Sequence, residues 1–219
     1  MKSIQLSSIA KKLIMSISGL FLILFLTLHA AINLIAVFSL EAYDAACEFM
    51  STNPVVQVMV PMLAAGFAVH IAFAFVLSWQ NRKARGTKKY ESGSKTKVSW
   101  ASQNMLVLGL IVLGFLAVHL SQFWAKMQLR EWTGQEVVKG SELVIEIFSN
   151  PINVIMYVVW ILALSLHLIH GFWSAFQSMG LNNSKWTKRI KIITHSYVTL
   201  ITATFLTTVI YFYINSLIK

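Results

Sequence analysis

The sequence predicts an all-α integral membrane protein, built as a bundle of five transmembrane helices in one domain that covers residues 1–219. Composition is the first observation: 57% of the residues are hydrophobic and 12% are charged, whereas soluble domains carry roughly a quarter charged residues. The second is a mean hydropathy of +0.67. The third is that the apolar residues gather in five runs, each long enough for the about 20 residues that a spanning helix needs.

The five predicted spans cover residues 12–40, 55–79, 100–125, 151–177 and 191–217. The apolar stretch of the first span, Leu13 to Leu40, is too long for a signal peptide, so we expect a retained helix. The second and fourth spans open with Asn53-Pro54 and Asn150-Pro151, where Asn favours the N-cap and Pro the first helical position. Charged loops bound the third and fifth spans, and the fifth is rich in Thr, which favours interhelical hydrogen bonds.

Loop charge alternates along the chain and predicts the orientation. Three segments are basic, and their cations are Lys2, Lys11, Lys12, Arg82, Lys83, Arg85, Lys88, Lys89, Lys95, Lys97, Lys185, Lys188, Arg189 and Lys191. The loop at 40–54 is acidic and the loop at 126–150 is mixed. The positive-inside rule therefore places the N-terminus in the cytoplasm and the C-terminus outside. Topology also accounts for the pI of 9.8, so we expect no nucleic-acid partner.

The two loops predicted to lie outside have a helical pattern of their own. Leu40–Met50 and Ser141–Phe148 are consistent with short amphipathic helices lying in the membrane interface. Ordinary connecting loops are an equally good interpretation. The single cysteine, Cys47, lies in the first of them and excludes an internal disulfide and a cysteine-based metal site.

Five histidines, namely His29, His70, His119, His167 and His170, lie inside apolar spans, where an imidazole is costly unless it is ligated or hydrogen-bonded. At about 1.5 Å rise per residue, His70 and His167 lie about 15 Å from the cytoplasmic edge. On the same scale, His29 lies about 25 Å and His119 about 30 Å from that edge. The depths therefore predict an inner pair, His70 with His167, and an outer pair, His29 with His119, with each member on a different helix.

Two imidazoles for each site suit the two axial positions of a haem, whose other ligands come from the porphyrin. The acidic residues all lie in loops, whereas zinc, copper or di-iron sites recruit larger or mixed ligand sets. Histidines that only connect helices by hydrogen bonds are the competing interpretation.

Small residues one turn from the inner pair, Gly66, Ala74, Ala163 and Gly171, predict room for a flat ring. The outer pair is flanked instead by larger side chains, namely Phe25, Asn33, Phe115 and Phe123. His170 is either an alternative ligand to His167 or a hydrogen-bonding partner of a haem propionate, and we favour the second. His195, near the start of the fifth span, is interpreted as an interfacial residue.

These motifs resemble the five-helix, single-chain, di-haem cytochrome b membrane anchor of succinate dehydrogenase and fumarate reductase. The resemblance covers essentially the whole chain. It rests on F-L-T-L-H-A-A-I-N around His29, His70 followed by N-R-K-A-R and Tyr90, H-L at His119, and H-L-I-H-G-F-W-S-A-F-Q-S-M-G from His167. The last of these is the most specific.

The resemblance implies that His70 and His167 bind the inner haem b and that His29 and His119 bind the outer one. The family ligand on the fourth helix precedes a glycine by four residues, which favours His167 over His170. Some members place a carboxylate within the fourth span for proton movement, whereas this chain has Ser165 and apolar neighbours there.

The implied function is electron transfer between membrane quinone and a cytoplasmic iron–sulfur subunit, which is joined to a flavoprotein that performs the succinate–fumarate chemistry. We expect the chain to lie in a bacterial cytoplasmic membrane, with a higher oligomer of the complex as a further possibility. The quinone, expected to be menaquinone, binds near the outer haem and needs a proton-exchanging group. Glu48 is the candidate, with Glu41, Tyr43 and Asp44 behind it. The alternatives are a cytochrome b anchor of a hydrogenase or formate dehydrogenase, and a haem-free transporter or scaffold.

Overall fold

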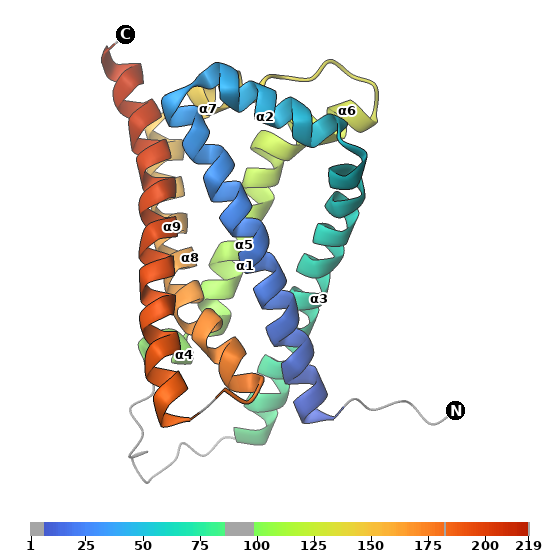
Figure 1. Ribbon diagram of the computed structural model, residues 1–219, viewed down its shortest axis with the longest axis vertical. Coiled ribbons are helices and arrows are strands. Elements are labelled where there is room, and N and C mark those ends of the chain that lie inside the picture. The colour runs from blue at the N-terminus through green and yellow to red at the C-terminus, as the bar shows by residue number, and fades with distance from the viewer. Residues whose placement is uncertain (1–6, 86–98, 182, 219) are drawn as a thin grey trace.

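The computed structural model describes residues 7–85, 99–181 and 183–218, and the secondary structure of this part of the chain is helical, with turns and loops between the helices (Figure 1). Among the described residues, five helical segments are long and apolar enough to cross a membrane, which agrees with the predicted number. Four of them are α1 (Ser8–Phe38), α3 (Pro54–Arg85), α8 (Pro151–Ser178) and α9 (Ser184–Ile218). The remaining one runs from Met105 to Trp132.

Side-chain caps start several of these helices where the sequence indicates. The Ser7 hydroxyl accepts from the amide of Ala10 at 3.1 Å and begins α1. Asn53 and Asn150 do the same for α3 and α8, each accepting from a backbone amide at 2.9 Å. The helices extend beyond the apolar runs, most clearly at α9, which begins at Ser184. Hydropathy marks only the part of a helix in hydrocarbon, whereas the backbone hydrogen bonds continue outside it.

The third span is irregular. A short helix, α4 (Trp100–Gln103), ends at Asn104, and α5 (Met105–His119) begins immediately after it. Beyond His119 the chain continues as a π-helix, η1 (Leu120–Leu129), and then as a turn of α-helix, α6 (Arg130–Trp132). π-Helical segments are rare in proteins, and those that occur are often found at functional sites. Because each π-turn takes more residues than an α-turn, η1 changes which side chains face the neighbouring helices.

The two predicted outer helices are present and lie across one end of the bundle, near the C-terminus (Figure 1). They are α2 (Leu40–Thr52) and α7 (Gly140–Phe148). The Asp44 carboxylate joins them, since it accepts from the amide and the hydroxyl of Ser141 at 2.9 and 2.6 Å. α7 packs its apolar face against the bundle, since Leu143 and Val144 are both 0% exposed.

The main buried cluster sits at this same end, where α7 packs among the long helices. Its members are Ala36, Tyr43, Leu143, Val144, Ile147, Phe148, Val154, Tyr157, Ile161, Val209 and Phe212. Elsewhere, large apolar side chains in the middle of helices are exposed, as at Leu24, Ile155 and Leu200. Such apolar surface is expected to face lipid.

The described basic residues of the N-terminal segment, the end of α3 and the start of α9 lie at the opposite end, beside the N-terminus (Figure 1). They are Lys11, Lys12, Arg82, Lys83, Lys185, Lys188, Arg189 and Lys191. Lys2, Lys88, Lys89, Tyr90, Lys95 and Lys97, which were named above, lie outside the described residues. The side of the membrane that this end faces stays a prediction.

Candidate functional site

The inner pair of histidines is brought together between two helices. The ring of His70 on α3 and the ring of His167 on α8 have centroids 6.3 Å apart and planes inclined by 71°. His170, one turn further along, instead has its ring 6.3 Å from that of Trp173, in an edge-on contact. Of the two candidate ligands on α8, His167 is therefore the one that faces His70.

Two other helices approach the edges of these rings. On α1, the Ser18 hydroxyl lies 3.4 Å from His70 Nδ1, and a Cβ on Gly19 would lie 3.3 Å from His70 Cε1. On α5, a Cβ on Gly109 would lie 3.7 Å from His167 Cε1. The sequence analysis gave none of these three residues a place beside the histidine rings; the available signal was a glycine inside an apolar span, which often marks close helix approach.

The prediction of open space beside the inner pair is half wrong. A Cβ on Gly66 would lie 2.7 Å from Cε1 of Phe21, so this glycine accommodates an aromatic ring of α1 instead. A Cβ on Gly171, by contrast, would meet nothing within 4 Å. Phe21 on α1 faces Gly66 on α3 and fills this space. The sequence of α3 alone does not reveal this contact, because it depends on how the two helices pack.

The outer pair is formed by His29 on α1 and His119 at the end of α5, with ring centroids 5.7 Å apart and planes inclined by 87°. Aromatic rings surround it. Phe25 stacks on His29 at 5.5 Å, and Phe123 and Trp160 lie 5.1 and 5.4 Å from His119. Phe115, the remaining predicted aromatic neighbour, stacks on Trp160.

A chain of hydrogen bonds leads away from His119. Its Nδ1 lies 3.2 Å from the Tyr157 hydroxyl, which donates to Gln122 Oε1 at 2.8 Å. Gln122 Nε2 donates to Asn153 Oδ1 at 3.3 Å, and Asn153 Nδ2 donates to the carbonyl of Ile147 at 3.1 Å. Because the single hydroxyl proton is used on Gln122, Tyr157 accepts from His119 Nδ1–H. We infer that His119 Nε2 carries the free lone pair.

We call this series of hydrogen-bonded side chains the Tyr157 relay (Tyr157, Gln122 and Asn153). The sequence analysis did not predict it. Its members come from η1 and α8, and only their polarity within apolar spans signalled them. Asn33 was expected near His29. Its Nδ2 donates to the His29 carbonyl at 2.8 Å and lies 3.4 Å from His29 Nε2.

The centroid separations of 6.3 and 5.7 Å leave room for one metal ion between the two rings of each pair. Imidazole nitrogens bind transition metals at about 2 Å, so rings on opposite sides of one metal have centroids about 6 Å apart. Within the described residues, no group of three or more His, Cys, Asp or Glu side chains could hold a metal ion alone. Each pair therefore suits a group that brings its own equatorial ligands, as a haem does.

Buried polar atoms without partners add to this fit. Among the described residues, His167 Nδ1 in the inner pair and Trp160 Nε1 beside the outer pair are buried and make no hydrogen bond. Buried nitrogens of this kind normally have a partner. Their position next to the paired rings is what a site built around an additional group requires.

The predicted proton-exchanging residues lie on α2. Glu48 is exposed, and within the described part of the chain its carboxylate makes no hydrogen bond or ion pair. Asp44 is occupied in capping α7, and Tyr43 is 5% exposed. Burial raises the pKa of Tyr43, and burial also raises the pKa of Cys47, to about 11. Glu48 thus stays a prediction, whereas Asp44 has a structural role.

Fold and site together define a multi-pass helical membrane protein with two interhelical imidazole pairs at two depths. The chain is similar to the succinate dehydrogenase cytochrome b558 subunit of Bacillus subtilis (strain 168). The two are 26% identical over 186 residues, which is 81% of this chain and 81% of the relative. No family model matches the chain, and no solved structure matches it.

Proposed function

We propose that this chain is the membrane anchor and electron-transfer subunit of a succinate:quinone oxidoreductase, working as a succinate dehydrogenase or a fumarate reductase. Similarity to the cytochrome b558 subunit supports the family. The observation that carries the proposal is the presence of two imidazole pairs, each contributed by two different helices. Two bound b haems would supply one-electron redox centres at two levels of the membrane.

The residues of the chain have separate tasks in this proposal. His70 and His167 hold the inner haem, and His29 and His119 hold the outer one. The Tyr157 relay holds His119 in the tautomer that presents Nε2, as hydrogen-bonded partners of metal-bound histidines commonly do. His170, beside Trp173, is available as a partner for a haem propionate.

The partners follow from the same proposal. An iron–sulfur subunit and a flavoprotein assemble on the basic end, where charge complementarity favours docking of an acidic surface. That end faces the cytoplasm of a bacterial cell by the positive-inside rule. Membrane quinone, which we expect to be menaquinone, reacts near the outer pair, and Glu48 on α2 is the candidate for exchanging its protons.

Haem content and difference spectra of the purified complex test the proposal. We expect two haems per chain and b-type bands in the reduced-minus-oxidised spectrum. His70→Ala or His167→Ala should remove the inner haem, and His29→Ala or His119→Ala the outer one. Replacement of His195, exposed near the start of α9, is the matched control and should leave both.

Two outcomes would contradict parts of this assignment. Loss of the inner haem in His170→Ala but not in His167→Ala would show that His170, and not His167, is the ligand on α8. Absence of b-type bands from the wild-type chain would favour a haem-free transporter or scaffold. Co-purification with a hydrogenase or formate dehydrogenase, instead of with an iron–sulfur subunit and a flavoprotein, would show that the chain anchors a different enzyme complex.

The role of Glu48 is tested separately by Glu48→Gln. We expect slower quinone turnover with both haems retained, because the amide cannot exchange the proton. Glu142→Gln on α7, another exposed carboxylate at the same end, is the control. Unchanged turnover in Glu48→Gln would reject the role and leave the haem assignment intact.

A further inference from the structure

The ring of His70, one of the two inner histidines, lies against two consecutive residues of α1. The Ser18 side chain is 8% exposed, and its hydroxyl lies 3.4 Å from His70 Nδ1. A Cβ added to Gly19 would lie 3.3 Å from His70 Cε1 and 3.6 Å from Nδ1. α1 therefore presents a hydroxyl and bare backbone to the same edge of one imidazole.

The hydroxyl of Ser18 determines which nitrogen of His70 carries the hydrogen. It donates to the carbonyl of Met15 at 3.0 Å, so it has only a lone pair to offer to His70 Nδ1. The Met15 backbone also hydrogen-bonds to the His70 side chain. Because both neighbouring groups act as acceptors, we assign the hydrogen to Nδ1. The lone pair that can bind a metal is then on Nε2.

Gly19 determines how closely the ring approaches α1. Carbon atoms pack favourably at about 3.5–4.0 Å, so a methyl group 3.3 Å from His70 Cε1 would force the ring to move. Gly109 on α5 provides the comparison at the other inner ring. A Cβ there would lie 3.7 Å from His167 Cε1, which is an ordinary contact. The two glycines therefore differ in whether a methyl group is tolerated.

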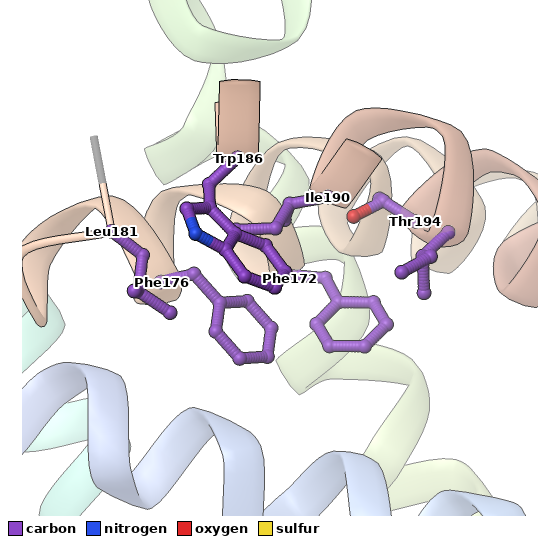
Figure 2. Close-up of a pocket in the computed structure, with 7 residues that line it drawn as sticks. Phe172, Phe176, Leu181, Trp186, Ile190 and Thr194 are labelled. Carbon is purple, nitrogen blue, oxygen red and sulfur yellow. The ribbon is translucent and has the colours of Figure 1, made fainter. Parts of the chain in front are cut away.

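The apolar pocket between α8 and α9 gives a displaced His70 ring no alternative place (Figure 2). Phe172 and Phe176 form its α8 side, and neither inner histidine lines it. Phe176 follows His167 by nine residues, which is about 180° around a helix of 3.6 residues per turn. A ring pushed by α1 therefore changes its orientation relative to His167, and does not enter this pocket.

We propose that Ser18 and Gly19 are positioning residues for the inner haem: Ser18 fixes the tautomer of His70, and Gly19 fixes the plane of its ring. This inference rests on the haem assignment of the proposed function. It gives α1 a task at both levels, since α1 also carries His29 of the outer pair, about 15 Å further along the helix axis.

Two measurable properties of the inner haem depend on these tasks. Donation from Nδ1–H makes the imidazole more electron-rich and stabilises oxidised iron, which lowers the reduction potential. The ring planes of His70 and His167 are inclined by 71°. The angle between two axial imidazole planes influences how the d orbitals of ferric iron split, and electron paramagnetic resonance (EPR) detects that splitting.

Potentiometric titration of the purified complex tests the task of Ser18. In Ser18→Ala we expect both haems to stay bound and the equilibrium constant for reduction of the inner haem to rise about two- to fivefold, because Nδ1–H loses one acceptor. At 59 mV per tenfold change, this is a rise of about 20–40 mV. Ser16→Ala is the matched control, since Ser16 is also buried on α1 but donates to the carbonyl of Lys12 in its own helix.

EPR of the oxidised complex tests the task of Gly19. Gly19→Ala should shift the low-spin signal of the inner haem, which is the signal lost from His70→Ala, and should leave the signal of the outer haem unchanged. Gly109→Ala is the matched control and should leave both signals unchanged, because its Cβ meets His167 at an ordinary distance. If Gly19→Ala does not bind the inner haem, the potential of Ser18→Ala decides, since that variant only removes an atom.

Each task can be rejected separately. An unchanged inner potential in Ser18→Ala would reject the task of Ser18, and an unchanged inner EPR signal in Gly19→Ala would reject that of Gly19. Equal shifts in Ser16→Ala or Gly109→Ala would reject the corresponding task as well, because they would indicate a general change in packing. None of these results would alter the haem assignment, which depends on the b-type bands of the wild type.

Discussion

Tyr157→Phe isolates the effect of the Tyr157 relay on the outer pair. The substitution removes one oxygen atom and leaves the ring that packs between Phe148 and Trp160. It breaks the contacts of the hydroxyl with His119 Nδ1 at 3.2 Å and with Gln122 Oε1 at 2.8 Å. His119 Nδ1–H then loses its acceptor in a buried site.

If the proposed function holds, the expected result is a higher reduction potential of the haem assigned to His29 and His119. Donation from Nδ1–H makes the imidazole more electron-rich and stabilises the oxidised iron, so its loss favours reduction. A neutral hydrogen bond is worth about 1 kcal/mol net. For a one-electron couple, where a tenfold change in equilibrium constant is 59 mV, this corresponds to an upper limit of about 40 mV. Because only part of the bond energy differs between the two redox states, we expect a rise of about 20–40 mV.

Potentiometric titration of the purified complex, followed at the b-type bands, measures this shift. The inner haem should keep its potential, since the relay does not touch His70 or His167. The control is Tyr197→Phe, which removes a hydroxyl that instead bonds to Thr27 and to the carbonyl of Ile23. An unchanged outer potential with both haems bound would refute the role assigned to the relay.

Two predictions concern the contact between α2 and α7. Burial raises the pKa of Cys47 from 9.0 to about 11, so the protonated thiol persists and maleimide labelling at pH 8 should be about 100-fold slower than for an ordinary thiol. Labelling should accelerate about tenfold per pH unit towards pH 11; a rate equal to that of Ala45→Cys in a Cys47→Ser background would contradict this. Gly140→Ala places a Cβ 2.9 Å from Cys47 Sγ and should destabilise the fold by about 1–3 kcal/mol. Gly114→Ala, with nothing within 4 Å, is its control, and equal thermal unfolding of the two would exclude tight packing at Gly140.

Histidine pairing is the part of the candidate site that could be predicted from the sequence. The rise of an α-helix is nearly constant, so distance along the chain converts directly into depth. His70 and His167 accordingly meet at one level, and His29 and His119 at another. The choice between His167 and His170 needed the structure or a family motif, because both lie on nearly the same face of one helix.

Other parts of the site depend on contacts between distant segments. Tyr157, Gln122 and Asn153 form one relay only because η1 and α8 lie side by side, and the π-helical turns set which side chains of η1 face α8. Gly66 was expected to leave open space, but the ring of Phe21 on α1 fills it. The sequence predicted that α7 is amphipathic, but only the structure shows that its apolar face packs into the main cluster.

The sequence alone determined the membrane class, the number of long apolar helices and the two levels of paired histidines, because hydropathy and helical rise are local properties of the chain. Only the tertiary structure decided how each helix is rotated about its axis and what therefore lies beside each ring. Rotation and packing depend on side chains from several helices at once, and no single segment encodes them.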